Sequence, residues 1–270
     1  MTEIPRSHPR YASLLARERV AEGVKQGYTS IQGLIAQGRG ECFDYLLGER
    51  TTAPAEAATK AAAALLLLAE RPALSVNGNV AALAAEEMVA LAAALNIPLE
   101  VNLFHRSEER VKKIADLLRE TGAKEVLGEH PDATVPGLEH ARALASRGGI
   151  YDADVVLIPL EDGDRCEALV AMGKKVIAID LNPLSRTARK ATVSIVDNIM
   201  RAVPNMAAQV RQLAALSRAD LVKMVQEYDN EKVLRQAVQE MLDHLERQFR
   251  SLQSSEAGPS SSPSSSPARS

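Results

Sequence analysis

Short apolar runs alternate with longer helical patterns through the middle of the chain. Strands are predicted at residues 74–76, 99–104, 125–127, 154–158, 175–180 and 193–196. The clearest helical pattern places Val111, Ile114, Ala115 and Leu118 on one face, with Ser107 as its cap. Strands separated by helices in this way indicate βαβ units and a parallel sheet. We therefore expect an α/β fold, a Rossmann-like doubly wound parallel sheet with additional N-terminal and C-terminal helices.

Helical patterns also lie on both sides of the predicted sheet. Residues 1–70 are predicted to be helices and residues 200–250 further helices. The N-terminal helices are expected to break at Gly27, Gly33, Gly38, Gly40 and Gly48. We expect them to pack on the sheet region, residues 71–200, so that residues 1–250 form a single domain. Residues 251–270 are a Ser/Pro-rich tail with almost nothing to bury, and we expect this tail to be disordered.

Charge and cysteine content narrow the classes of protein. The net charge of −3 gives no basic surface of the kind that nucleic acid requires, so no nucleic-acid partner is expected. Cys42 and Cys166 are far apart, which favours neither a disulfide framework nor a zinc site and indicates a reducing cytoplasm. The N-terminus lacks the apolar segment of a signal peptide, and the longest apolar run, residues 61–69, is too short to cross a bilayer. We expect a cytoplasmic protein with no membrane partner.

Polar residues gather where the predicted strands end. The clusters are Asn77-Gly78-Asn79, His105-Arg106, the five residues 161–165, Asp180-Leu181-Asn182 and Asp197-Asn198. Ligands of open parallel sheets bind beyond the carboxyl ends of the strands, near the point where the strand order reverses. A ligand with several polar and charged parts would explain why all five clusters meet at one edge.

Each cluster also has a structural alternative. Asn77-Gly78-Asn79 fits a tight turn as well as a helix start that holds a phosphate. Glu161, Asp162 and Asp164 fit a helix cap as well as a Mg²⁺ site. Asp180 is placed to contact a ribose.

The basic residues that follow Asp180-Leu181-Asn182 also have both a functional and a structural interpretation. Arg186, Arg189 and Lys190 fit either phosphate binding or a solvated surface. The chain has no GxxxxGK[ST], GxGxxG, GxSxG or HExxH motif. The residues by themselves therefore define an anion-binding α/β protein, with a nucleotide among its candidate ligands.

A series of segments resembles one known family. In chain order they are IPRSHPRY (4–11), GRGE (38–41), FDYL (43–46), GERT (48–51), SVNGNVAAL (75–83), NLF (102–104), PGLEH (136–140), PLEDGDR (159–165), IDLNPLSR (179–186) and VDN (196–198). In this order they are similar to the archaeal phosphopantothenate synthetase (4-phosphopantoate–β-alanine ligase) family, to about residue 245. Gln37 stands where the family pattern leads us to expect His, and Thr187 where it leads us to expect Ser.

The resemblance implies an amide ligation in coenzyme A biosynthesis. The substrates would be 4-phosphopantoate and β-alanine, the cofactors ATP and Mg²⁺, and the products 4-phosphopantothenate, AMP and pyrophosphate. The acid would first form an acyl adenylate, from which the amine of β-alanine displaces AMP. Catalysis would come mainly from positioning and from cations that face the phosphates. The resemblance also implies a homodimer.

The resemblance assigns site residues as well. The ATP site carries over onto Arg17, Arg39, Asp180, Leu181, Asn182, Arg186, Thr187, Asn198 and Ile199. Arg39 and Arg186 would be the catalytic cations, because a guanidinium can bind two phosphate oxygens at once. For phosphopantoate we expect Asn77, Gly78 and Asn79, with Arg106 or His140 nearby, and for Mg²⁺ Asp162 or Asp164.

Two other functions fit the same fold. A nucleotide-binding regulatory protein would bind ATP without turnover, and a sugar-phosphate isomerase would not need the cluster from Asp180 to Thr187.

Overall fold

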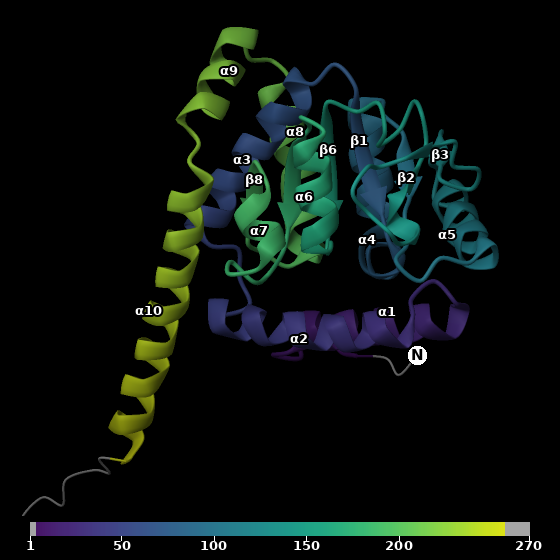
Figure 1. Cartoon of the computed structure of the whole chain (residues 1–270). Helices are drawn as coiled ribbons and strands as arrows, with labels where there is room; N and C mark the ends of the chain where they lie inside the picture. Colours follow the sequence, from purple (N-terminus) through teal and green to yellow (C-terminus); the bar gives the residue numbers. More distant parts are fainter. Residues whose placement is uncertain (1–3, 257–270) are drawn as a thin grey trace, which may run out of the picture.

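A computed structural model describes residues 4–256 of the 270-residue chain, with side chains to residue 253 (Figure 1). The helices are α1 (Tyr11–Gln26), α2 (Ile31–Leu47), α3 (Ala53–Leu68), α4 (Gly78–Leu95), α5 (Glu108–Glu120), α6 (Gly163–Ala171), α7 (Arg186–Lys190), α8 (Ile199–Leu213), α9 (Arg218–Glu227) and α10 (Asn230–Glu256). The strands are β1 (Pro72–Val76), β2 (Leu99–Val101), β3 (Val126–Leu127), β4 (Ala133–Thr134), β5 (Leu144–Ala145), β6 (Val155–Pro159), β7 (Lys175–Ile179) and β8 (Val193–Ile195). A 3₁₀ turn, η1 (Ala141–Ala143), precedes β5.

Six strands form one parallel sheet in the order β3-β2-β1-β6-β7-β8. Leu74 of β1 pairs with Leu99 on one side and with Leu157 on the other. From β1 the chain builds outwards through β2 and β3, and then returns to the other side of β1 with β6. The order therefore reverses between β1 and β6, where loops that leave the two strands in opposite directions open a crevice. The predicted doubly wound α/β fold is confirmed.

Alternate residues of the central strands point into two cores. Leu157 and Ile177 pack with α3, α4, α5 and α8 on one face of the sheet. Val156 and Val176 pack on the other face with α6 and with the β4–β5 hairpin. This two-residue period follows from the pleat of the strands, and burial on both faces explains their continuous apolar runs.

Helices α1 and α2 lie across the carboxyl edge of the sheet (Figure 1). Gly27 and Gly48 end them with φ near +85°, as predicted. The breaks predicted at Gly33, Gly38 and Gly40 are wrong, because α2 continues through all three. An isolated glycine lowers helix stability without ending a helix, and here tertiary contacts outweigh that cost.

Helix α10 runs beside α3 and α2 and then extends beyond the rest of the molecule (Figure 1). It continues to Glu256, beyond residue 250, where the C-terminal helices were predicted to end. Its apolar positions repeat with helical spacing, which gives the segment a reason to stay helical. The remainder of the predicted tail, residues 257–270, lies outside the described residues.

Helix α4 is the one described helix whose length and composition would also suit a membrane span. It packs against α1, α5 and α8, and half of its residues are buried inside the molecule. These contacts account for its apolar composition as that of a core helix.

Candidate functional site

A cavity of about 290 Å³ lies at the reversal of strand order. Its walls come from the α1–α2 turn and the start of α2, from the β1–α4 junction, and from the segments after β2 and β6. The polar residues that line it are Ser30, Gln32, Asn77, Asn79, His105, Arg110, Arg142 and Asp162. Two arginines therefore face one carboxylate, and the start of α4 adds a favourable dipole for an anion.

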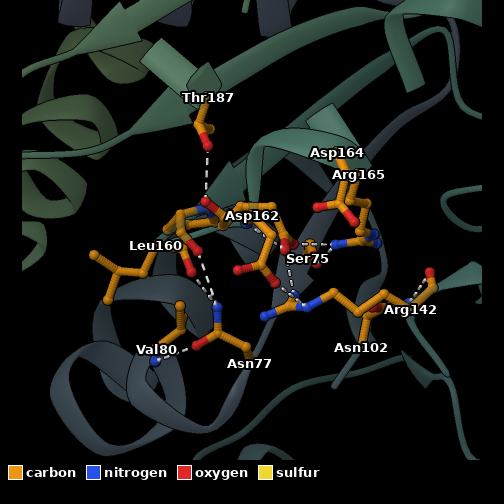
Figure 2. Close-up of polar contacts among 12 residues, drawn as sticks. Ser75, Asn77, Val80, Asn102, Arg142, Leu160, Asp162, Asp164, Arg165 and Thr187 are labelled. Carbon is orange, nitrogen blue, oxygen red and sulfur yellow. Dashed lines mark hydrogen bonds and ion pairs between the residues drawn. The ribbon is translucent and has the colours of Figure 1, made fainter. Parts of the chain in front are cut away.

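The three residues predicted for phosphopantoate, Asn77, Gly78 and Asn79, line this cavity, but they are already engaged by the protein. The Asn77 Oδ1 accepts hydrogen bonds from the backbone of Asn79 and Val80 at 3.1 Å, which caps α4. Its Nδ2 donates to the carbonyls of Pro159 and Leu160, both at 3.0 Å. Asn77 thus ties the end of β1 to the end of β6 (Figure 2).

The other two residues of this segment, Gly78 and Asn79, contact the N-terminal helices. The Nδ2 of Asn79 donates to the Gly33 carbonyl at 2.8 Å. A Cβ on Gly78 would lie 2.3 Å from the carbonyl oxygen of Tyr28, so only glycine permits this close approach. The structural alternative therefore describes the three residues well, and ligand contacts must come from other groups in the wall.

A chain of charges runs from the cavity wall into the interior of the molecule, and Figure 2 shows its polar contacts. Glu161, whose side chain is 1% exposed, pairs with Arg142 at 2.5 Å and with Arg165, which is fully buried. Arg165 also donates to Ser75 Oγ at 3.1 Å. The Arg142 Nε lies 3.0 Å from Asp162 Oδ2. Burial raises the pKa of Asp162, and the charge of Arg142 opposes that rise.

Residues of β2 and its end position the loop that carries Arg142. The Nδ2 of Asn102 donates to the Leu144 carbonyl at 2.8 Å. The buried Glu100 carboxylate accepts from the backbone of Ser146 and Ile150 at 2.9 and 2.7 Å. Burial raises the pKa of Glu100, while these two hydrogen bonds oppose the rise. These contacts bring Arg142, which is distant from β2 in the sequence, to the point where the strand order reverses.

The two carboxylates to which the resemblance assigned Mg²⁺ are each engaged by another side chain. Asp162 pairs with Arg142, and Asp164 lies 2.7 Å from His140 Nε2. Asp162 occupies the N-cap position of α6, but its side chain makes no capping hydrogen bond. Across the described residues, no group of three or more His, Cys, Asp or Glu side chains could hold a metal ion.

The residues predicted for ATP lie farther along the same edge, at the ends of β7 and β8. Asp180 follows β7 and accepts from Ser185 Oγ at 2.5 Å and from the Asn182 backbone at 2.9 Å. Burial raises the pKa of Asp180, and the Ser185 hydrogen bond and the charge of Arg39 oppose that rise. Leu181 is buried below Gly40 of α2. Arg39 and Asp180 are thus brought together.

Residues that begin two helices complete this second region. Arg186 begins α7, and its side chain leaves no room for a Cβ on Gly163. Thr187 Oγ1 donates to the Glu161 carbonyl at 2.8 Å. Asn198 caps α8, whose first residue is the buried Ile199, and its Nδ2 donates to Asp44 at 2.9 Å.

Arg17 and Gln37 are held by the N-terminal helices. Arg17 pairs with Glu41 at 3.0 Å and donates to the hydroxyl of Tyr45 at 2.7 Å. Gln37, at the position where His was expected, is 7% exposed. Helix α2 thus reaches from the cavity, through Ser30 and Gln32, to the region of Asp180 and Asn198.

Arg106 and His140 lie near the cavity without lining it. Arg106 donates to the carbonyl of Gly128 at 2.7 Å, away from the cavity wall. Arg110, which sequence reasoning missed, lines the wall one helical turn later. The signal was present in the sequence, since Arg110 lies in the first turn of a helix that Ser107 caps. Arg142 was also missed, and no local pattern marks it.

The fold is that of a doubly wound α/β protein, with a polar cavity lined by two arginines at the reversal point of its sheet. The family described as phosphopantothenate/pantothenate synthetase matches residues 54–244. The 4-phosphopantoate–β-alanine ligase of Methanosarcina mazei is 60% identical over 91% of this chain and 96% of its own length. Ligases of the same name from Thermococcus kodakarensis and Methanospirillum hungatei are 56% and 50% identical, over 92% and 90% of this chain and 95% and 98% of their own lengths.

The chain belongs to the phosphopantothenate/pantothenate synthetase family. It is a ligase, and the resemblance stated from the sequence segments is confirmed.

Proposed function

We propose that the protein condenses 4-phosphopantoate with β-alanine to 4-phosphopantothenate, in coenzyme A biosynthesis. ATP would supply the driving force and leave as AMP and pyrophosphate. The observation that carries this proposal is the identity of 50–60% to relatives named 4-phosphopantoate–β-alanine ligase, over at least nine-tenths of both chains. The geometry supports it, because two polar regions lie side by side along one sheet edge.

The region at the ends of β7 and β8 suits the nucleotide. Asp180 and the amides of Asn182 and Asn198 can bind ribose hydroxyls or base edges, and Arg186 lies beside the start of α6. Arg39 and Arg17 reach this region from α2 and α1. Guanidinium groups from separate elements can neutralise a triphosphate as charge moves during its cleavage.

The cavity between β2 and β6 suits the phosphorylated acid. A carboxylate oxygen of the acid would attack the α-phosphorus of ATP, and the bond to pyrophosphate would break. The acyl adenylate that forms is a mixed anhydride. The neutral amine of β-alanine would then attack its carbonyl carbon, and AMP would leave with the electron pair of the broken C–O bond. Holding the acid and the nucleotide on adjacent strand ends supplies the proximity that both steps need.

Mg²⁺ is implied by the ATP chemistry, but the predicted ligands fit it poorly. Asp162 is paired with Arg142, and Asp164 shares a hydrogen bond with the His140 imidazole. Mg²⁺ commonly keeps several waters and binds through substrate phosphates. We propose that the ion arrives with ATP and is held mainly by its phosphates, so no residue is assigned to it here.

We also propose that the enzyme is a cytoplasmic homodimer. Apolar side chains remain exposed on α2 and on the outer half of α10, namely Ile31, Leu34, Ile35, Leu242, Leu245, Phe249 and Leu252. Such a surface is typical of an interface between protein chains. Light scattering should give twice the chain mass, and a monomer mass at micromolar concentration would contradict the proposal.

One assay tests the chemistry. Purified protein is mixed with ATP, Mg²⁺, 4-phosphopantoate and β-alanine, and pyrophosphate release is followed with a coupled reaction. We expect 4-phosphopantothenate, AMP and pyrophosphate in equal amounts, and none when the acid is omitted. ADP and phosphate would replace the adenylate by an acyl phosphate. ATP binding without any product would favour a regulatory protein.

A further inference from the structure

Among residues 4–253, Arg110 forms no ion pair with a carboxylate, and its charge acts only weakly on the neighbouring Glu109. Its Nη1 donates to the His105 carbonyl at 2.7 Å, and its Nε donates to the Gly27 carbonyl at 3.2 Å. The adjacent Glu109 pairs with Lys113 instead. Two backbone carbonyls from different elements thus fix the guanidinium in the wall of the cavity, while its charge stays available to a ligand.

The other arginine of the wall differs in this respect. Arg142 is 7% exposed and is paired with both Glu161 and Asp162. Its charge is therefore largely compensated by the protein. Of the two, Arg110 is the better partner for a dianion, because charge-assisted hydrogen bonds are strongest where no competing carboxylate is present.

The direction of the substrate follows from the sheet. In the proposed reaction the carboxylate of the acid must face the nucleotide region, which lies beyond β6 at the ends of β7 and β8. Its phosphate must then point the other way, towards β2. Arg110 lies on that side, because it touches His105 just after β2. Neighbouring strands are about 4.8 Å apart, so β2 and β6 are separated by roughly 10 Å, which a four-carbon acid with a terminal phosphate can span.

We propose that Arg110 binds the phosphate of the acid substrate and sets the preference for a phosphorylated over an unphosphorylated acid. This inference rests on the proposed function and adds to it a residue for substrate specificity. The description of the family names both phosphopantothenate and pantothenate. Arg106, which the sequence favoured, is directed to the Gly128 carbonyl and does not compete for this role.

The test compares two acids in one variant. Wild type and Arg110→Met are assayed for pyrophosphate release with 4-phosphopantoate and with pantoate, each at saturating ATP and β-alanine. The ratio of kcat/KM for the phosphorylated over the unphosphorylated acid should fall at least about tenfold in Arg110→Met, mainly through KM. Arg119→Met makes the same change in the last turn of α5, where the arginine forms exposed ion pairs, and should leave the ratio unchanged.

A purely structural role would reduce both acids equally. An unchanged ratio in Arg110→Met would therefore overturn the inference while the ligase activity stands, whereas no product in wild type would remove the proposed function itself. Arg110→Gln, which keeps one donor for a carbonyl, covers the case in which the methionine variant fails to fold. Inorganic phosphate should compete with 4-phosphopantoate in wild type and at least tenfold more weakly in Arg110→Gln. Equal competition in both would refute the inference.

Discussion

The buried carboxylate of Glu161 offers the sharpest test of the structure. It is the anion between Arg142 and Arg165, whose side chains are 7% and 0% exposed. Glu161→Gln keeps the shape but removes the charge. Removing one partner of a buried ion pair costs about 3–5 kcal/mol, because the other charge stays buried without compensation. Asp162 still pairs with Arg142, so we expect the lower end, about 3 kcal/mol.

Urea unfolding followed by circular dichroism measures this loss. A change of about 3 kcal/mol should also lower the Tm by roughly 6–12 °C in a chain of this size. Glu227→Gln removes the same charge from an exposed pair with Lys223, and its free energy of unfolding should stay within about 0.5 kcal/mol of wild type. If Glu161→Gln costs less than about 1 kcal/mol, the charge chain does not stabilise the fold in the way argued.

Three further changes probe other parts of the molecule. Arg39→Ala should lower turnover at least about tenfold, or about 1.4 kcal/mol in transition-state stabilisation, and unchanged steady-state kinetics would remove it from the site. Asp180→Asn should raise the free energy of unfolding near pH 7 and bind ATP more weakly. Burial raises the pKa of Asp180 in the folded state, so the contribution of this carboxyl to stability is present below about pH 4 and is lost as the pH rises. The gain in unfolding free energy from Asp180→Asn should therefore shrink in acid, and a gain that persists there would count against this reasoning. Gly78→Ala should destabilise the fold by about 1–3 kcal/mol, because the new Cβ would meet the Tyr28 carbonyl. Gly38→Ala, whose new Cβ would have nothing within 4 Å, should instead stabilise the fold by up to about 1 kcal/mol. Chemical unfolding of both variants checks this contrast.

The sheet could be predicted because its strands are buried on both faces. The run at residues 154–158 has no polar alternation, and helix-length spacings on either side leave few arrangements other than a parallel sheet. The β4–β5 hairpin was missed, because two-residue strands carry almost no periodic signal. The helix breaks predicted at the glycines of α2 were wrong for a related reason. Local propensity is weak, and contacts such as that of Asn79 with Gly33 decide the outcome.

The site was predictable in its location and less so in its side chains. Strand ends of a parallel sheet must share an edge, so Asn77, Asp180 and Asn198 were correctly placed on one side of the molecule. Which arginine lines the cavity depends on where α5 begins, because Arg106 precedes its cap at Ser107 and Arg110 lies in its first turn. Arg142 depends on contacts from β2 to a loop about forty residues later, which a single sequence does not reveal.

The Asn77 side chain uses its oxygen to cap α4 and its nitrogen to join the ends of β1 and β6. This wall of the cavity leaves little room for natural variation, because any replacement of Asn77 would loosen the junction between the end of β1, the start of α4 and the end of β6 before it altered a ligand contact. Differences in which acid such enzymes accept must then arise from the helices and loops of the opposite walls. Attempts to engineer a new acid preference should accordingly begin at the first turn of α5 and leave the strand junction untouched.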